Sequence, residues 1–339
     1  MAFREEYPGS NAGIEVRLMQ AADAAGVVEL YKTVYGNDYP VKTVYDPAAI
    51  IEQQNNGEMY RIIARSGDKV VGQTALYRST SPNPEIYEAG QGIVLPLYRN
   101  QGILEQCLDY GHEVAYPQLN IKQEWGEAVC NHTFTQKAGT RLGAFETGIE
   151  LDLMPASSYV KEQSSQGRVA ALLMFKIFQA APPQLLYLPE AYADSLHYLY
   201  SVYDFGHKFV SSNSLLPEQA TRGQVEIYAD AAVARFTLLE TGKDLENYLL
   251  EQERLAQAQG CSVFQAYLKL ANPAVDQAVN LLRKHQYFLG GILPRWFATD
   301  GLLMQKLLHE PNLEGINLYS ERAHKILNII IDDRNTVLL

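Results

Sequence analysis

The sequence predicts an α/β protein made of two tandem units, each with a mixed, mostly antiparallel central sheet flanked by helices. Three observations support this fold class. Strand-like and helix-like segments between residues 12 and 155 follow the order β-α-α-β-β-β-α-β-α-β. At 339 residues, the chain is longer than the ~250–300 residues at which single cores stop growing. Short patterns of the first half also recur in the second half.

The elements of the first half follow from the spacing of apolar residues. Residues 14–18 alternate like a short strand, and residues 21–35 carry apolar side chains on one helical face. Strands at 59–65 and 70–78 flank the turn Ser66-Gly67-Asp68-Lys69, which is typical of a hairpin. The other elements are predicted as helices at 48–54, after Gly102 and at 133–141, and as strands at 86–95, 125–130 and 145–153.

A polar segment at 154–167 indicates a linker between the two halves. We therefore expect a first domain at 1–158 and a second domain at 159–339. In the second half, strands are predicted at 168–178, 185–188, 225–228, 231–239 and 262–270, and helices at 189–203, 245–259 and 273–285.

The two halves share a sequence echo. In each, a strand is followed by an asparagine, a glutamine five residues later, a helix, and then a Phe and a Gly-Ile pair. The residues are Asn131, Gln136, Phe145, Gly148 and Ile149 in the first half, and Asn272, Gln277, Phe288, Gly291 and Ile292 in the second. The second half is interpreted as a degenerate copy of the first. Two unrelated α/β units with common turn chemistry are the alternative.

The segment between residues 86 and 115 has the arrangement that a diphosphate site needs. A strand leads through the turn Arg99-Asn100-Gln101-Gly102-Ile103-Leu104 into a helix, whose first amides lack intrahelical partners. Those amides, the helix dipole and the Arg99 cation all favour a diphosphate. An ordinary strand-turn-helix corner with a solvent-facing arginine is the alternative. Gly90 and Gly92, inside the strand, indicate a bulge or a close approach of a ligand.

The segment Val94-x-Pro96-x-Tyr98-Arg99-Asn100-Gln101-Gly102-Ile103 resembles the acetyl-CoA-binding segment of the GNAT acyltransferases, and the element order of residues 12–155 is also theirs. Leu104 replaces the Gly or Ala usual at the end of that motif. The resemblance implies that a backbone amide of the strand end polarises the thioester carbonyl. It implies cofactor contacts at Ile93, Val94, Leu95, Arg99, Asn100, Gln101, Gly102, Ile103, Leu104 and Asn131.

The catalytic candidates come from the same resemblance. Glu88 lies on the motif strand, where family members often carry the carboxylate that deprotonates the acceptor. The family's thiolate-protonating tyrosine falls on Ala138 or Gly139 here, so His132 is the nearest titratable substitute. The alternatives are a solvent-facing Glu88, a surface His132 and an Asn131 that only caps the next helix.

Four tyrosines follow one another where the family borders the acceptor site: Tyr31, Tyr35, Tyr39 and Tyr45. They could line a pocket for an aromatic or cationic acceptor. The alternative is amphipathic packing of this helix and loop against the core.

Composition excludes several other classes. The net charge of 28 − 39 = −11 argues against nucleic-acid binding and a polybasic membrane-surface role. The three cysteines form no CxxC pair, the N-terminus has no signal-peptide core, and the longest apolar run, Val169–Phe175, is too short for a membrane span. We expect a cytoplasmic protein. No metal-ligand spacing of histidines, GxSxG elbow or GxxxxGK[ST] loop occurs, so no metal site is predicted.

The sequence thus predicts an enzyme, an N-acyltransferase that moves an acetyl or other acyl group from acetyl-CoA to a small-molecule or protein amine. The alternative is a non-catalytic acyl-CoA-binding sensor or interaction protein. The second half has Glu240 and Asp244 where the first has its Arg99 turn, and these acidic residues would repel a diphosphate. We therefore expect no cofactor there.

Overall fold

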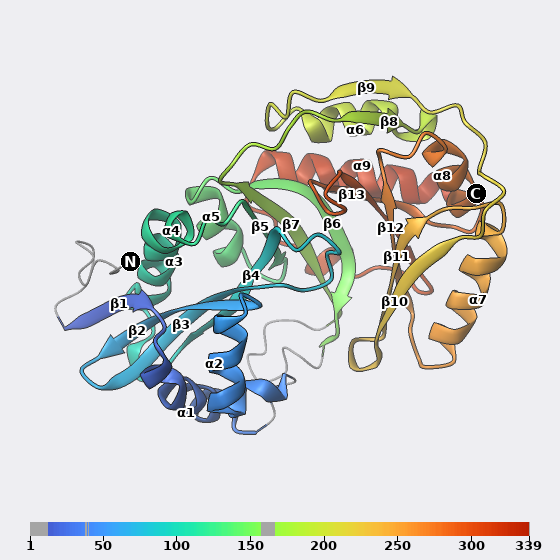
Figure 1. Ribbon diagram of the computed structural model, residues 1–339. Helices are drawn as coiled ribbons and strands as arrows, with labels where there is room; N and C mark the ends of the chain where they lie inside the picture. The colour runs from blue at the N-terminus through green and yellow to red at the C-terminus, as the bar shows by residue number, and fades with distance from the viewer. Residues whose placement is uncertain (1–12, 38, 40, 157–166, 339) are drawn as a thin grey trace. The chain divides into compact units, whose positions relative to one another are not determined.

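The computed structural model describes residues 13–37, 39, 41–156 and 167–338. The chain divides into two compact units (Figure 1). The first contains Met1–Gly126 and Ile177–Gln179, and the second contains Glu127–Lys176 and Ala180–Leu339. The domain boundary expected between residues 158 and 159 falls within 157–166, outside the described residues, and stays a prediction.

The sheet of the first unit has the strand order β1-β2-β3-β4-β5. The pairs β1–β2, β2–β3 and β3–β4 are antiparallel, and β5 runs parallel to β4, with pairs at Ile86, Tyr87 and Glu88. The strands are β1 (Ile14–Leu18), β2 (Met59–Ser66), β3 (Lys69–Tyr77), β4 (Ile86–Val94) and β5 (Gln123–Val129), whose last residues belong to the second unit.

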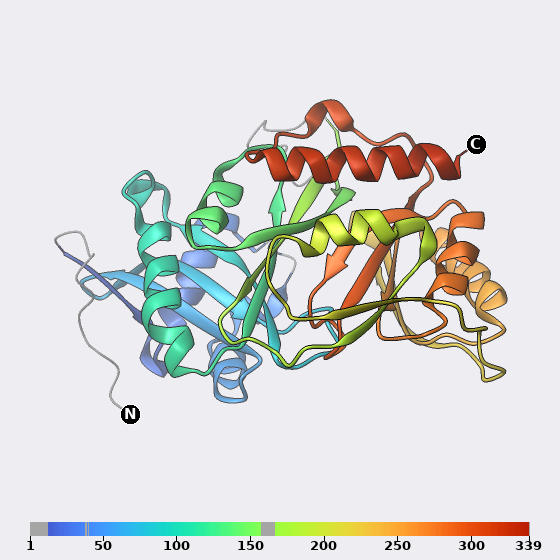
Figure 2. The same cartoon turned by 90° about the horizontal axis from the view of Figure 1, so that it is seen from above.

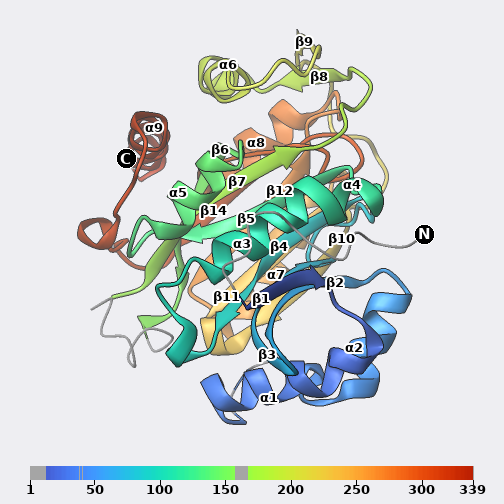
Figure 3. The ribbon, with the colours of Figure 1, turned by 90° about the vertical axis from the view of Figure 1, so that its left-hand side faces the viewer.

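Helices cover both faces of this sheet. The helices α1 (Ala24–Tyr35) and α2 (Pro47–Asn55) lie on one face (Figure 3). The opposite face carries α3 (Ile103–Tyr110), which continues through a π-helical segment into α4 (Tyr116–Gln118). Gly72 of β3 allows this packing, because a Cβ atom there would lie 2.9 Å from Ile103 Cγ2.

In the second unit the end of β5 is followed, in strand order, by β7-β6-β13-β14-β12-β11-β10. Its strands are β6 (Phe145–Met154), β7 (Val169–Ile177), β10 (Arg222–Tyr228), β11 (Val233–Glu240), β12 (Val263–Lys269), β13 (Phe288–Leu293) and β14 (Gly301–Leu307). Its helices are α5 (Phe134–Arg141), α6 (Ala193–Tyr200), α7 (Leu245–Gln257), α8 (Val275–Lys284) and α9 (Glu321–Val337). A separate parallel pair joins β8 (Leu185–Leu188) and β9 (Lys208–Ser211). The long helix α9 packs on β6 and β13 (Figure 2).

The strand order confirms the predicted mixed, mostly antiparallel architecture and repeats itself along the chain. One series of neighbouring strands runs in the order β3-β4-β5-β7-β6. The other runs in the order β10-β11-β12-β14-β13, so the last two strands of each series exchange places in the same way. In both series the parallel pair, β4–β5 or β11–β12, is connected through helices. This agreement supports the interpretation of a duplicated fold.

The sequence echo has a structural cause at the contact of β6 with β13. Gly148 of β6 pairs with Gly291 of β13. A Cβ atom at Gly148 would lie 2.4 Å from the Gly290 carbonyl oxygen, and one at Gly291 would lie 2.4 Å from Gly148 Cα. The two backbones therefore touch where any side chain would separate the equivalent strands of the two copies.

Each unit has its own hydrophobic core, which includes Val27, Ile62 and Cys107 in the first and Phe236 and Phe264 in the second. None of the described helices is long and apolar enough to cross a membrane. Within the described residues, no group of three or more His, Cys, Asp or Glu side chains could hold a metal ion.

Candidate active site

The turn after β4 leads into the N-terminus of α3, whose N-cap residue is a glycine. Asn100 and Gly102 have positive φ values of 61° and 71°, which reverse the chain into α3 at Ile103. Gly102 is the N-cap residue and makes no side-chain capping hydrogen bond. The first amides of a helix have no intrahelical partner, so this end of α3 presents its donors to a ligand.

Arg99 lies along one edge of β4. The Leu95 amide donates to the Val71 carbonyl of β3, so the amide and carbonyl of the preceding Val94 point away from β3. On that side the Arg99 Nε donates to the Val94 carbonyl, at 3.3 Å. The side chains of Ile93 and Leu95 are buried, whereas Arg99 is exposed. The Arg99 cation and the Val94 amide thus share the edge that leads to the N-terminus of α3.

Leu104 occupies space that a missing side chain leaves on β4. A Cβ atom at Gly92 would lie 3.1 Å from Leu104 Cδ1, so the leucine packs over this glycine. The residue that departs from the family motif is therefore matched by a glycine on the neighbouring strand.

The bulge predicted from Gly90 and Gly92 is present. The pairing of β4 with β3 shifts between Gln73 and Ala75, and Gln91 has a φ of 51°. The bulge turns the Gln91 side chain toward α1, where its Oε1 accepts a hydrogen bond from the Tyr31 hydroxyl, at 2.6 Å. The strand β4 therefore bends at this bulge.

Glu88 lies among tyrosines on the α1 face of the sheet. The Tyr77 hydroxyl donates to Glu88 Oε1, at 2.5 Å, and the same hydroxyl would lie 2.8 Å from a Cβ atom at Gly90. The Tyr39 ring packs against Tyr31 and Tyr35, with centroids 4.9 and 5.0 Å away. Burial raises the pKa of Tyr39 to about 12, with smaller contributions from Tyr35 and Glu88. The carboxylate thus adjoins the predicted acceptor-side tyrosines.

Asn131 and His132 belong to the second unit. The Asn131 carbonyl accepts a hydrogen bond from Asn317 Nδ2, at 3.3 Å, and the His132 ring packs 5.1 Å from the Phe134 ring. The idea that Asn131 caps the next helix is wrong, because α5 begins three residues later, at Phe134, and Thr133 is its N-cap residue. Their roles toward a cofactor stay predictions.

The glutamines of the sequence echo are structural. Gln136 Oε1 accepts from the Tyr319 amide, at 2.9 Å, and Gln277 Oε1 accepts from the Leu216 amide, at 2.7 Å. Each glutamine thus fixes a passing segment to its unit.

In the second copy, the equivalent helix N-terminus is covered by residues 217–221. The Gly242 amide donates to Thr221 Oγ1, at 3.0 Å, and the Lys243 amide donates to the Pro217 carbonyl, at 2.9 Å. A Cβ atom at Gly242 would lie 1.8 Å from the Gln219 carbonyl oxygen. The expectation that no cofactor binds there stays a prediction, and this covering segment supplies a physical reason beyond the acidic residues.

No family model and no curated protein matches the chain. Among solved structures, it is similar to the ribosomal-protein-S5-alanine acetyltransferase from Vibrio fischeri (13% identity, 51% of this chain and 98% of that chain, TM-score 0.39). It is also similar to an N-acetyltransferase from Staphylococcus aureus Mu50 (12% identity, 50% of this chain and 99% of that chain, TM-score 0.39). A third similar structure is the PaiA N-acetyltransferase from Thermoplasma acidophilum in complex with coenzyme A (13% identity, 49% of this chain and 99% of that chain, TM-score 0.31). All three TM-scores are below 0.5. The fold of the first half is therefore argued from the strand order of its sheet and not from these similarities. About half of this chain, the N-terminal half, is similar to GNAT acetyltransferases.

Proposed function

We propose that the first half binds acetyl-CoA and that the protein transfers the acetyl group to an amine. One observation supports this proposal: Glu88 lies on β4, and the turn that follows this strand carries Arg99 and leads into the N-terminus of α3 at Gly102. The open amides and the exposed guanidinium fit the diphosphate of coenzyme A, because both are donors of positive character.

Each residue then has a defined task in the transfer. The amides of residues 102–104 and Arg99 hold the diphosphate, and the Val94 amide, which points away from β3, polarises the thioester carbonyl. The bound thioester supplies an activated acyl group. Glu88 takes one proton from the ammonium, the amine nitrogen bonds to the acyl carbon, the C–S bond breaks, and the nitrogen releases its second proton as the thiolate gains one. The departing thiolate takes its proton from water or from a modest acid, for which His132 stays the candidate that the sequence offers.

Tyr77 positions the proposed base. Its hydroxyl fixes one carboxylate oxygen of Glu88, so the side chain is held on the face where Tyr31 and Tyr39 lie. A base must be oriented before it can take a proton in a reactive geometry. Losing Tyr77 should therefore slow the transfer less than losing Glu88 itself.

The sensor alternative rests on the helix that follows β5. The slot of the missing tyrosine falls on Ala138 or Gly139 of α5, and neither can donate a proton. A protein that binds acyl-CoA and transfers nothing would need no donor there.

The test is the release of free thiol from acetyl-CoA in the presence of a panel of amines. We expect amine-dependent release that falls by ~10²–10⁴-fold in Glu88→Gln, the range typical of general acid–base catalysis. Glu29→Gln, which changes an exposed carboxylate of α1, is the matched control. If coenzyme A binds but no amine stimulates thiol release, the sensor alternative replaces the transferase.

A further inference from the structure

Arg61 of β2 is a buried cation with an incomplete set of partners. Its side chain is 0% exposed, and its Nη2 donates to the neutral Gln53 Oε1, at 3.2 Å. Among the residues that the structure describes, Nε and Nη1 have no hydrogen-bond partner. Burial lowers the pKa of this guanidinium, yet an arginine stays protonated in proteins.

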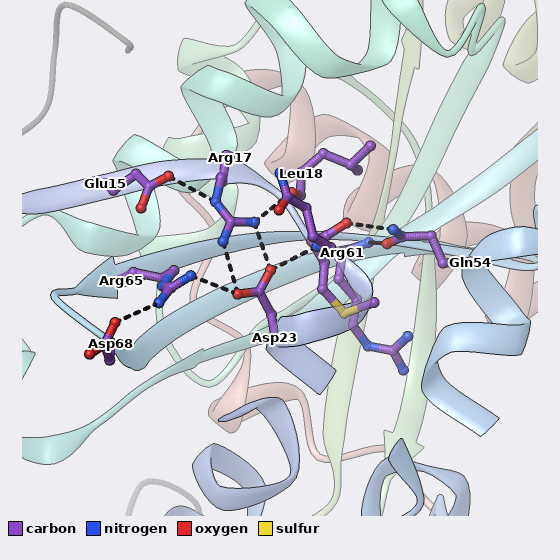
Figure 4. A network of polar contacts seen from close by, with 10 residues as sticks. Glu15, Arg17, Leu18, Asp23, Gln54, Arg61, Arg65 and Asp68 are labelled. Atoms are coloured by element: carbon purple, nitrogen blue, oxygen red, sulfur yellow. Dashed lines mark hydrogen bonds and ion pairs between the residues drawn. The ribbon is translucent and has the colours of Figure 1, made fainter. Parts of the chain in front are cut away.

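Two neighbouring arginines of the same unit, by contrast, have a counter-charge. Arg17 and Arg65 share the Asp23 carboxylate, with N–O distances of 2.6 and 3.0 Å. Figure 4 shows the Arg61 guanidinium apart from this group. Among the described residues, Arg61 forms no ion pair. A buried charge without a counter-charge is costly, and functional sites are where such a cost is retained.

The place of Arg61 in the sheet connects it to the proposed reaction centre. Arg61 pairs across the strands with Ala75 of β3, and Ala75 pairs with Gly90 of β4. The Tyr77 hydroxyl, which donates to Glu88, lies over Gly90 in this row of residues. Strands lie about 4.8 Å apart, so β2 and β4 are separated by only ~10 Å.

Tyrosines connect these two charged groups. Burial raises the pKa of both Tyr31 and Tyr39, the Arg61 cation opposes this rise, and the Glu88 carboxylate adds to it at Tyr39. The Tyr31 hydroxyl accepts a hydrogen bond from Gln73 Nε2, at 2.9 Å, so this ring of the cluster is fixed in position. A cation-binding carboxylate and an anion-binding guanidinium thus adjoin one cluster of rings.

We propose that the acceptor is a small amine that carries a carboxylate, with the carboxylate bound to Arg61 and the ammonium directed toward Glu88. This inference rests on the proposed acyl transfer and names its substrate class, an amino acid or similar compound. The carboxylate supplies the counter-charge that Arg61 lacks among the described residues, and Tyr35 and Tyr39 of the adjoining ring cluster are partly exposed. A polycationic acceptor is disfavoured because Arg61 would repel it.

The test compares amines in pairs that differ only by the carboxylate: tyrosine with tyramine, phenylalanine with phenethylamine, and lysine with cadaverine. Binding is measured by calorimetry, with and without saturating coenzyme A. In at least one pair the wild-type protein should bind the carboxylated member roughly 10- to 100-fold more tightly, as expected for a charge-assisted contact. This comparison does not depend on any variant being folded.

Variants then assign the preference to Arg61. Arg61→Met should abolish it and Arg61→Lys should keep part of it, whereas Arg65→Met, a change on the same strand, should leave it intact. Three results would each overturn the inference: equal affinities within every pair, a preference that persists in Arg61→Met, or tighter binding of an aminoalkyl phosphonate, tested as a further ligand, than of the matched amino acid. Transfer to amines regardless of a carboxylate refutes this inference alone, and a carboxylate preference without coenzyme A binding refutes only the proposed transfer.

Discussion

Replacing Arg61 by methionine should make the ligand-free protein more stable. The substitution keeps a long side chain in the core but removes a fully buried charge whose Nε and Nη1 lack partners among the described residues. Replacing buried charges by apolar residues of similar size stabilises proteins by ~1–4 kcal/mol. The lost hydrogen bond to Gln53 costs about 1 kcal/mol, so we expect a net gain of roughly 0–3 kcal/mol.

Arg65→Met, on the same strand, should have the opposite effect. Arg65 pairs with Asp23, whose side chain is 2% exposed, and its removal leaves Arg17 alone to neutralise this carboxylate. Breaking a buried pair by removing one partner costs ~3–5 kcal/mol, and the remaining Arg17 should reduce this loss. Opposite effects of the two substitutions on stability would distinguish an arginine that is retained to bind a ligand from one that stabilises the fold.

The measurement is urea unfolding followed by tryptophan fluorescence. The chain has two tryptophans, Trp125 in the first unit and Trp296 in the second, both buried. In a Trp296→Phe background, Trp125 reports the unit that contains Arg61. A destabilised Arg61→Met protein, with the same denaturant dependence as wild type, would refute the reasoning, because Arg61 would then have a stabilising partner.

Three further predictions follow from the geometry. Arg99→Ala should weaken coenzyme A binding by ~1–3 kcal/mol in calorimetry, whereas an unchanged affinity would remove the diphosphate assignment. Gly148→Ala should destabilise the second unit by ~1–3 kcal/mol or more, because its Cβ atom would lie 2.4 Å from the Gly290 carbonyl oxygen; an unchanged midpoint of the Trp296 transition would show that the backbones can separate freely. Burial raises the pKa of Cys130 to about 12 from the usual 9.0, so the unfolded thiol ionises first and stability should fall between pH 9 and 12. Cys130→Ala should lessen that fall in urea titrations, and an equal fall in both proteins would assign it to other groups.

Local patterns predicted the elements well because they depend on neighbours in sequence. The strand-turn-helix at Arg99 and the bulge between Gly90 and Gly92 follow from backbone preferences, and both are present. The helix α9 was not predicted, although the sequence contains its N-cap residue, Ser320. The Ser320 side chain accepts a hydrogen bond from the Ala323 amide.

Features that depend on distant residues could not be read in this way. In the sequence, Arg17, Arg61 and Arg65 look alike on their strands, and only the folded unit shows that two of them share Asp23. The same is true of Leu104, whose fit depends on a glycine of the neighbouring strand.

The central claim is that this protein transfers an acetyl group from acetyl-CoA to an amine. Its most direct test is mass spectrometry of a mixture of amino acids and their decarboxylated counterparts, incubated with isotopically labelled acetyl-CoA and the protein. We expect a labelled N-acetyl product that forms with the wild type and Glu29→Gln, and that is lost or strongly reduced with Glu88→Gln. A protein that binds coenzyme A but produces no labelled amine, or one in which Glu88→Gln retains full activity, would contradict the mechanism.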